Sequence, residues 1–341
     1  MSHMSTERIG ITIAAYNAQG YLARAVESVL AQTDENWQLV IVDDGSTDST
    51  LSVAQRYADA DSRITAITQE NADAAAARNR GMSMLDTTWV TYLDADDELE
   101  AAYVSEMRDF LQAFPGFDYY SCNGIVIAPN GSKELHSGRT QPHEISLSDM
   151  LNGCQIINAG TLQRKAAFLE SGGFDESLHF SEDYCFMLPT LAQGKRLIAT
   201  NRPLYRYHTT HSGRKSSHFE ADLNAFQIIE TVAHTYDLSE EELKASQDGR
   251  AAHRLLMARS FWSMGCKQRQ ETLDNPRIDE EIKRMLLSSR RVMTGVYAER
   301  LQKALHAIIG EKKARAIWTV MYSPYRMVKP LRDALRGRAQ Q

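Results

Sequence analysis

Short apolar runs alternate with segments of helical periodicity in the N-terminal part of the chain. Runs rich in β-branched residues at 9–13, 39–42 and 64–67 predict buried strands. Between them, apolar residues recur at helical spacing, which predicts amphipathic helices. A fourth strand is predicted over 89–93, after an alanine-rich helix over 72–85. Strands and helices that alternate in this order predict an α/β fold with a largely parallel sheet and right-handed crossovers.

The pattern changes near residue 215. The sheet domain is expected to span 9–215, with a last strand over 196–207, and the polar segment 131–143 is expected to be irregular. Over 216–341 mainly helical periodicity remains, which predicts a helical C-terminal region. Residues 1–8 begin with Met-Ser-His-Met, interpreted as a cloning remnant, and they stay outside the fold argument. The helices expected in the C-terminal region are 220–236, 240–266, 279–296 and 298–309.

Acidic residues cluster directly after two of the predicted strands. Asp43 and Asp44 follow the second strand, and Asp94, Asp96 and Asp97 follow the fourth. Carboxylates this close together repel each other and are costly to dehydrate, so a cation or donor groups are expected between them. Ligands of parallel sheets bind beyond the carboxyl ends of the strands. The pattern therefore predicts a divalent metal, Mg²⁺ or Mn²⁺, and a phosphorylated ligand at this edge.

Several other site types are excluded or disfavoured. The turn 14–20 holds a single glycine, so the G-x-G-x-x-G loop of a dehydrogenase is missing. The chain contains no G-x-x-x-x-G-K-[ST] loop, no zinc-ligand spacing and no G-x-S-x-G elbow. Four widely separated cysteines without a CxxC pair indicate a reducing compartment.

Charge is distributed unevenly along the chain. Residues 283–341 contain 14 Lys and Arg against 3 Asp and Glu, a balance of +11, so the preceding residues carry −6 − 11 = −17. An acidic body argues against a nucleic acid partner, because phosphate contacts require clustered basic residues. The basic, aromatic-containing tail could instead contact an anionic membrane surface, although a solvated basic face is the default interpretation. No apolar run approaches the roughly 20 residues that a bilayer span requires.

A candidate general base lies further along the chain. Glu182 and Asp183 precede a helix predicted over 184–194. A carboxylate there could remove a proton from an attacking hydroxyl. It could equally serve only to cap the helix, because helix N-termini favour negative charge. The pattern alone leaves both roles open. Similarly, Asp43 is better explained as a turn cap than as a ligand contact.

Seven motifs within residues 9–213 occur in a shared order and spacing, and jointly they are specific. They are 11–17 (ITIAAYN), 28–33 (SVLAQT), 42–48 (VDDGSTD), 71–79 (NADAAAARN), 92–97 (YLDADD), 172–175 (GGFD) and 182–183 (ED). With them the chain resembles inverting, nucleotide-sugar-dependent glycosyltransferases of family 2. The resemblance implies the GT-A fold, a Rossmann-like, mostly parallel twisted sheet flanked by helices.

The resemblance also implies roles for residues on the donor side. Asp44 would bind the nucleotide base, with uracil as the expected base. The backbone near Ala14 and Tyr16 would line the same pocket. Arg78 would lie beside the ribose or diphosphate, and Asp94 would face the ribose.

On the reaction side, the resemblance implies that Asp96 binds the metal with Asp97 in support. Asp183 would deprotonate the acceptor hydroxyl in a single displacement that inverts the anomeric carbon. His211 resembles the late histidine that completes the metal shell in some members. His208 competes for that role, and a lone histidine is more often structural than a ligand.

Two residues depart from the family pattern. Ala14 stands where the family usually has proline, and Asp73 stands where a glycine commonly follows Asn71. Asp73 restricts the backbone and adds negative charge near the expected diphosphate. Both departures concern the geometry of the donor-side loops.

The expected function is transfer of a sugar, most simply from a UDP-sugar, to a glycan or lipid-linked acceptor during synthesis of a surface polysaccharide or glycoconjugate. The expected location is the cytoplasm, with peripheral contact to the inner face of the membrane, and the C-terminal helices could pair subunits. A sugar-phosphate nucleotidyltransferase is disfavoured because 14–20 is neither glycine-rich nor basic. A non-catalytic scaffold with the same fold is disfavoured because Asp94, Asp96 and Asp183 are all present.

Overall fold

The computed structural model divides into two units by internal contacts. The first unit comprises 1–150 and 155–214, and the second comprises 151–154 and 215–341. The residues that the structure describes are 8–138, 140–153, 156–209, 218–264 and 266–289.

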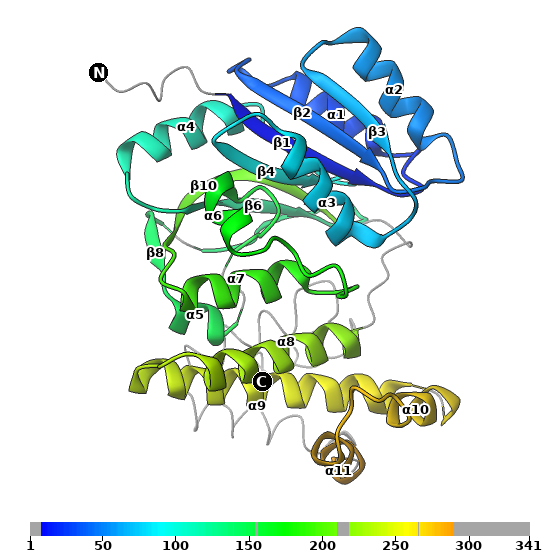
Figure 1. The fold of residues 1–341 in the computed structure, drawn as a ribbon, viewed down its shortest axis with the longest axis vertical. Helices are drawn as coiled ribbons and strands as arrows, with labels where there is room; N and C mark the ends of the chain where they lie inside the picture. Colours follow the sequence, from blue (N-terminus) through cyan, green and yellow to red (C-terminus); the bar gives the residue numbers. More distant parts are fainter. Residues whose placement is uncertain (1–7, 139, 154–155, 210–217, 265, 290–341) are drawn as a thin grey trace, which may run out of the picture. The chain divides into compact units, whose positions relative to one another are not determined.

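Four parallel strands form one half of the sheet of the first unit (Figure 1). Their order is β3-β2-β1-β4, and each side-by-side pair is parallel. The apolar runs of these strands are almost wholly buried in β1 and β2, because helices cover the faces of the sheet. The strands are β1 (Ile9–Ala15), β2 (Trp37–Asp43), β3 (Ile64–Thr68) and β4 (Trp89–Asp94), and the helices between them are α1 (Leu22–Leu30), α2 (Thr50–Ala60) and α3 (Asp73–Met84).

The other half of the sheet mixes strand directions. Beyond β4 the order continues β9-β6-β10-β5, where β6 and β10 are parallel and the remaining pairs are antiparallel. The fold is therefore an α/β fold with a mixed, mostly parallel sheet. These strands are β5 (Glu98–Leu99), β6 (Tyr119–Ile127), β9 (Leu162–Arg164) and β10 (Leu197–His208), and the helices of this half are α4 (Tyr103–Ala113), α5 (Leu147–Leu151), α6 (Lys165–Glu170) and α7 (Glu182–Ala192).

The expectation of an irregular segment over 131–143 is wrong. It contains β7 (Lys133–Leu135), which pairs with β6, and the first residue of β8 (His143–Ile145), which pairs with β10. All three residues of β7 are exposed, so the strand lacks the alternation of apolar and polar residues that would have predicted it.

Helix α3 packs closely on the sheet at Gly81. A Cβ at Gly81 would lie 1.8 Å from Oγ1 of Thr12 on β1, so only glycine permits this approach. Thr12 is fully buried, and its hydroxyl donates to the carbonyl of Val40 on β2 (3.1 Å). The contact fixes the height of α3, which carries Arg78, above the strands.

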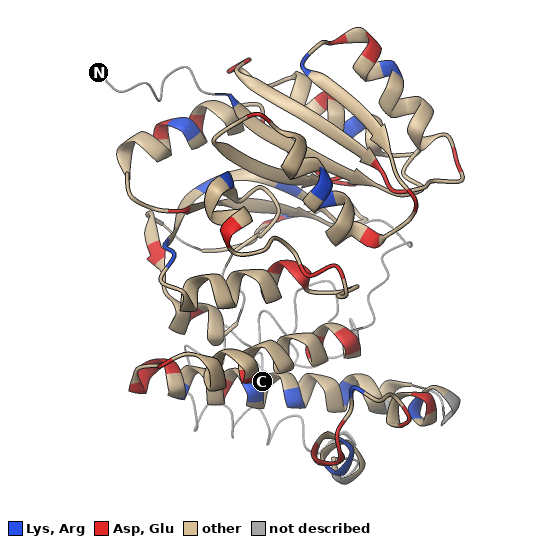
Figure 2. Cartoon of the chain, viewed as in Figure 1, with Lys and Arg blue, Asp and Glu red and all other residues tan. Residues whose placement is uncertain are grey.

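The second unit contains α8 (His218–Thr235), α9 (Glu240–Ser263), α10 (Cys266–Leu273) and α11 (Glu280–Ser288). The helix expected over 240–266 corresponds to α9, which ends three residues earlier, at Ser263. The helix expected over 298–309 lies outside the described residues. The start of α9 has a capping box, in which Ser239 and Glu242 satisfy each other's backbone N–H. Acidic side chains gather at this start and basic ones follow along the helix (Figure 2).

The helices of the second unit enclose an apolar core of their own. The buried core residues include Phe219, Leu223, Phe226, Met257, Phe261, Ile282 and Leu286.

Among the described helices, none combines the length and hydropathy that a bilayer span requires.

Candidate functional site

Strand register brings the two aspartate clusters to one edge of the sheet. Strand β1 runs between β2 and β4, and its last residues pair with both neighbours. Ala15 is in register with Asp43, and Ala14 is in register with Asp94. The clusters therefore flank the end of β1, where ligands of parallel sheets bind.

Hydrogen bonds tie the loop after β1 to the loop after β2. Asn17, at a φ of +48°, accepts from the backbone N–H of Thr47 (2.9 Å), and its own N–H donates to the Ser46 hydroxyl (2.9 Å). The Gln19 N–H donates to the Asp48 carboxylate (3.2 Å). The two loops consequently form one connected platform beside the strand ends.

Asp44 lies within this platform and is 3% exposed. Its Oδ1 accepts from the Gln69 side-chain amide (2.7 Å) and from the Ala72 N–H (3.0 Å). These donors compensate a buried carboxylate and hold it in one orientation. The neighbouring Asp43 accepts from the Thr68 hydroxyl (2.8 Å), whereas its Oδ1 is buried without a hydrogen-bond partner among the described residues.

The remaining donor-side residues lie around the platform. Ala14 is half-buried at the end of β1, and Tyr16 follows it with 45% exposure. Asp73 begins α3 with a φ of +68°, a left-handed conformation that the family's glycine would adopt without strain. Its carboxylate lies 2.6 Å from Nδ1 of His179, so the substitution introduces a surface contact with a distant loop.

Arg78 is the buried cation of the site. It belongs to the face of α3 that packs on the sheet, yet its guanidinium bonds to Asp94 (2.6 Å) and to Glu182 at the start of α7. It also lies 4.3 Å from the ring centroid of Tyr92. Burial alone would lower the pKa of Arg78, but Asp94 and Glu182 outweigh it and hold the pKa well above its ordinary value.

Helix α7 begins at Glu182, two residues earlier than the start expected at 184, and Asp183 follows in its first turn. Its carboxylate accepts from the Tyr184 N–H (2.7 Å) and, at 3.4 Å, from the Tyr92 hydroxyl. Burial, followed by repulsion from the Glu182 carboxylate, raises the pKa of Asp183 to about 6, although nearby Arg78 opposes the shift. Asp183 is therefore a carboxylate that can accept a proton near neutral pH.

The acidic turn after β4 holds its residues in different environments. Asp97 is fully buried and accepts from the Tyr205 hydroxyl (2.9 Å) and the His208 N–H (2.7 Å). Asp94 and Asp96 are each partly exposed. The ring of His208, the competing candidate ligand, lies 2.6 Å from the carboxylate of Glu98.

These oxygens fit a hard divalent cation. Among the residues that the structure describes, no group of three or more His, Cys, Asp or Glu side chains is arranged to hold a metal ion. Mg²⁺ and Mn²⁺ need fewer, because one or two carboxylates suffice when water and substrate phosphates complete the shell. Asp96, with its neighbour Asp94, offers that donor set. His211 lies outside the described residues.

Reasoning from the sequence missed the partners that connect these residues. Tyr92 joins the site through its ring and hydroxyl, and Glu182 joins it as the partner of Arg78. A signal for the second contact was present, because an arginine within the buried alanine run of α3 requires a carboxylate partner.

Comparisons with known proteins agree with this architecture. Residues 11–168 match the family model described as glycosyl transferase family 2. Glycosyltransferase GlyA of Streptococcus pneumoniae is 37% identical over 212 residues, which cover 59% of this chain but only 30% of GlyA. WfaP of Escherichia coli, named as a UDP-Glc:α-D-GlcNAc-diphosphoundecaprenol β-1,3-glucosyltransferase, is 29% identical over 234 residues, 66% of this chain and 87% of WfaP.

Two solved structures share the fold. The structure of TarS from S. aureus in complex with UDP-GlcNAc has a TM-score of 0.60 at 16% identity, covering 94% of this chain and 91% of that one. The mannosyltransferase PcManGT from Pyrobaculum calidifontis, in complex with GDP-Man and Mn²⁺, has a TM-score of 0.54 at 15% identity, covering 93% and 84%. The first unit therefore has the GT-A fold that these structures share. Residues 11–168, within the first unit, belong to glycosyltransferase family 2 by their match to the family model.

Proposed function

We propose that this protein transfers a sugar from a nucleotide-sugar, most simply a UDP-sugar, to a hydroxyl group of its acceptor with inversion. One observation carries the proposal. Asp183, a carboxylate whose pKa is raised to about 6, lies next to the Glu182–Arg78–Asp94 ion-pair chain that leads to the expected donor edge. A base and a donor site joined in this way suit proton removal coupled to departure of a diphosphate.

The reaction is a single displacement. The acceptor oxygen attacks the anomeric carbon and forms the new C–O bond while the bond from that carbon to the diphosphate oxygen breaks. The nucleoside diphosphate leaves with the bonding electron pair. Asp183 takes the hydroxyl proton on a carboxylate oxygen, and the Tyr92 hydroxyl orients that carboxylate.

The donor would bind across the platform at the strand ends. Asp44 would accept the ring N–H of the base through its charged carboxylate, beside backbone near Ala14 and Tyr16. Asp94 would accept from the ribose hydroxyls, and Arg78 would face the diphosphate. The ties of Asp44 to Gln69 and Ala72 support this role, because they leave the carboxylate oriented before a ligand arrives.

A divalent cation would be held by Asp96, with Asp94 and Asp97 beside it, and His211 stays a predicted further ligand. Bound there, the ion would supply positive charge that neutralises the diphosphate. Asp97 itself is bonded to Tyr205 and to the His208 N–H, so its role would be to stabilise the turn that presents Asp96.

The relatives support a role in building a surface polysaccharide or glycoconjugate, and the cytoplasmic side of the membrane stays the predicted location. The name of WfaP states a UDP-glucose donor and a diphosphoundecaprenol-linked acceptor, which supports a lipid-linked acceptor here. The basic segment 283–341 would help by contacting an anionic membrane. Most of that segment lies outside the described residues, and the sugar, the acceptor and pairing of subunits through the C-terminal helices stay predictions.

The decisive experiment replaces the base. Asp183→Asn should lower transfer from a responsive UDP-sugar by about 10²- to 10⁴-fold, while UDP affinity measured by calorimetry changes little. Asp109→Asn, at an exposed position on α4, is the control and should behave as the wild type.

In the wild type, kcat should fall about tenfold per pH unit below about 6, as the base becomes protonated. An active Asp183→Asn enzyme, or pyrophosphate release from a nucleoside triphosphate and a sugar phosphate, would refute the proposal.

A further inference from the structure

Helix α3 carries a second polar residue directly after Arg78. The side-chain amide of Asn79 pairs with one residue of the loop that follows α6. Its Oδ1 accepts from the Phe174 N–H (2.9 Å), and its Nδ2 donates to the Phe174 carbonyl (2.8 Å). The same Nδ2 donates to the Glu176 carboxylate (2.9 Å). One side chain thus satisfies both backbone groups of a loop residue and one neighbouring carboxylate.

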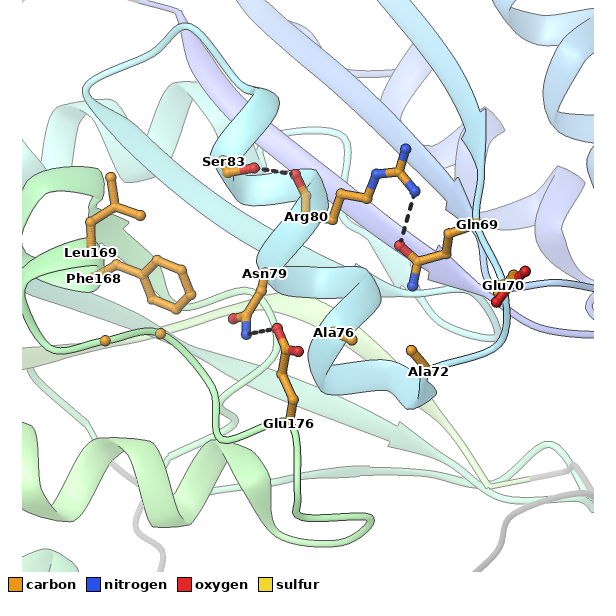
Figure 3. A pocket seen from close by; sticks show the side chains of 12 residues that line it. Gln69, Glu70, Ala72, Ala76, Asn79, Arg80, Ser83, Phe168, Leu169 and Glu176 are labelled. Atoms are coloured by element: carbon orange, nitrogen blue, oxygen red, sulfur yellow. Dashed lines mark hydrogen bonds between the residues drawn. The ribbon is translucent and has the colours of Figure 1, made fainter.

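The loop is shaped to receive this amide. Gly172 and Gly173 have φ values of +86° and +72°, in the region that favours glycine. A Cβ on Gly173 would lie 2.9 Å from the Asn79 Oδ1, so a side chain there would displace the amide. Figure 3 shows Asn79 on α3 facing Glu176. Both residues line a pocket of about 620 Å³, together with Phe168 and the two glycines.

Phe174, which Asn79 holds, packs against the residues that surround Asp183. It is 3% exposed, and its ring packs edge-on against Tyr92 (5.6 Å between centroids) and against Phe186 of α7 (5.2 Å). Tyr92 is the residue whose hydroxyl meets Asp183, and Phe186 lies one helical turn after Asp183. The bonds of Asn79 therefore reach the base through two packed aromatic contacts.

We propose that Asn79 is a positioning residue for sugar transfer, which holds Phe174 so that Tyr92 and the first turn of α7 place Asp183 beside Arg78. The inference rests on the proposed function and adds to it. Adjacent residues of one helix then serve the two halves of the site, with Arg78 pairing directly to Asp94 and Glu182 while Asn79 acts through the loop. Asp73 at the start of α3 also contacts His179 of the same loop. This contact is exposed, so solvent screens it and it contributes little.

The test compares Asn79→Ala with Ser83→Ala. Ser83 lies one turn further on α3 and lines the same pocket, but its hydroxyl donates to the Arg80 carbonyl within the same helix (2.7 Å). Asn79→Ala should lower kcat about tenfold or more, because small misplacements of reacting groups are costly, while UDP affinity stays within about twofold. The acidic limb of its pH–rate profile, where kcat falls as the base is protonated, should move to lower pH. A less firmly held Asp183 gains contact with water, so its pKa falls back towards the ordinary value.

A rescue pair covers the case in which Asn79→Ala does not fold. Asn79→Asp keeps the acceptor for the Phe174 N–H but places a carboxylate against Glu176. Adding Glu176→Gln restores a donor across that contact, so the double variant should be at least about threefold more active than Asn79→Asp.

The outcomes separate this inference from the proposed function. If the wild type transfers sugar, and a folded Asn79→Ala matches Ser83→Ala in kcat and in its acid limb, Asn79 does not position the base. A double variant no more active than Asn79→Asp leads to the same conclusion where the alanine variant is unfolded. A wild type that transfers no sugar overturns the proposed function instead.

Discussion

The two sides of the candidate site hold their carboxylates in contrasting ways. On the donor side, Asp44 is buried among neutral donors, the Gln69 amide and the Ala72 N–H. On the base side, Asp183 lies beside a second carboxylate, Glu182, with Arg78 as the compensating cation. Neutral donors fix the direction of a charge, whereas burial together with a like charge raises the proton affinity of Asp183.

This difference suits the two proposed tasks. A carboxylate that binds the base of a nucleotide must stay charged and point one way throughout the reaction. A carboxylate that takes a proton must instead change its charge, so its pKa should lie near the working pH. The structure therefore combines a preorganised donor side with an electrostatically adjusted base side.

The largest expected effect is a loss of stability on replacing Arg78, the cation on the base side. Arg78→Met should lower the free energy of unfolding by about 3–5 kcal/mol, because it leaves Asp94 and Glu182 partly buried without their cation. Denaturant unfolding measures the change. Arg196→Met, which breaks the exposed pair with Glu144, is the control and should leave the midpoint almost unchanged. Equal losses in the two variants would show that the base side does not depend on a buried cation.

Replacing Asp183 should instead increase the stability of the protein. The folded pKa of Asp183, about 6, exceeds its ordinary value of 3.8, so its contribution to stability is present below pH 3.8 and is lost as pH rises to about 6. Asp183→Asn should therefore stabilise the protein above pH 6 by up to about 3 kcal/mol, with no gain below pH 4. Thermal unfolding across pH measures this.

Asp61 supplies the matched contrast. Its hydrogen bond with Arg63 lowers the pKa of Asp61, so Asp61→Asn should lose stability at neutral pH and converge with the wild type as pH falls. If both variants change stability in the same direction at pH 7, the assigned environment of Asp183 is wrong.

The smallest expected effect sharpens the donor side. Asp44→Asn should weaken UDP binding by about tenfold, because the amide can still accept from Ala72 but then presents a donor to the ring N–H. Calorimetry measures the UDP affinity, and Asp59→Asn on the exposed face of α2 is the control. Unchanged affinity would remove Asp44 from the nucleotide site.

The parallel half of the fold could be predicted because its signals are local. The runs at 9–13 and 39–42 lie within β1 and β2, and the aspartates that follow them lie at the strand ends. Other elements depend on tertiary contacts. β7 is an exposed strand on the sheet margin, and its polar sequence carries no strand period.

The site itself was only partly predictable, for the same reason. Arg78 and Glu182 are 104 residues apart, and Tyr92 and Asp183 are 91 apart, so no local pattern links them. A motif can name a carboxylate as a base, but the pKa of Asp183 depends on its neighbours in space. Those neighbours come from α3, β4 and α7 together.

The close seat of α3 on β1 has a wider consequence. Because Gly81 lets the helix rest against Thr12, the same close contact sets the position of both Arg78 and Asn79 on α3. Any change that moves α3 away from the sheet would displace Arg78 beside the expected nucleotide site and, through Asn79, the base Asp183 at the same time. Variation in sugar or acceptor preference would therefore be easier to obtain in the surrounding loops than along α3.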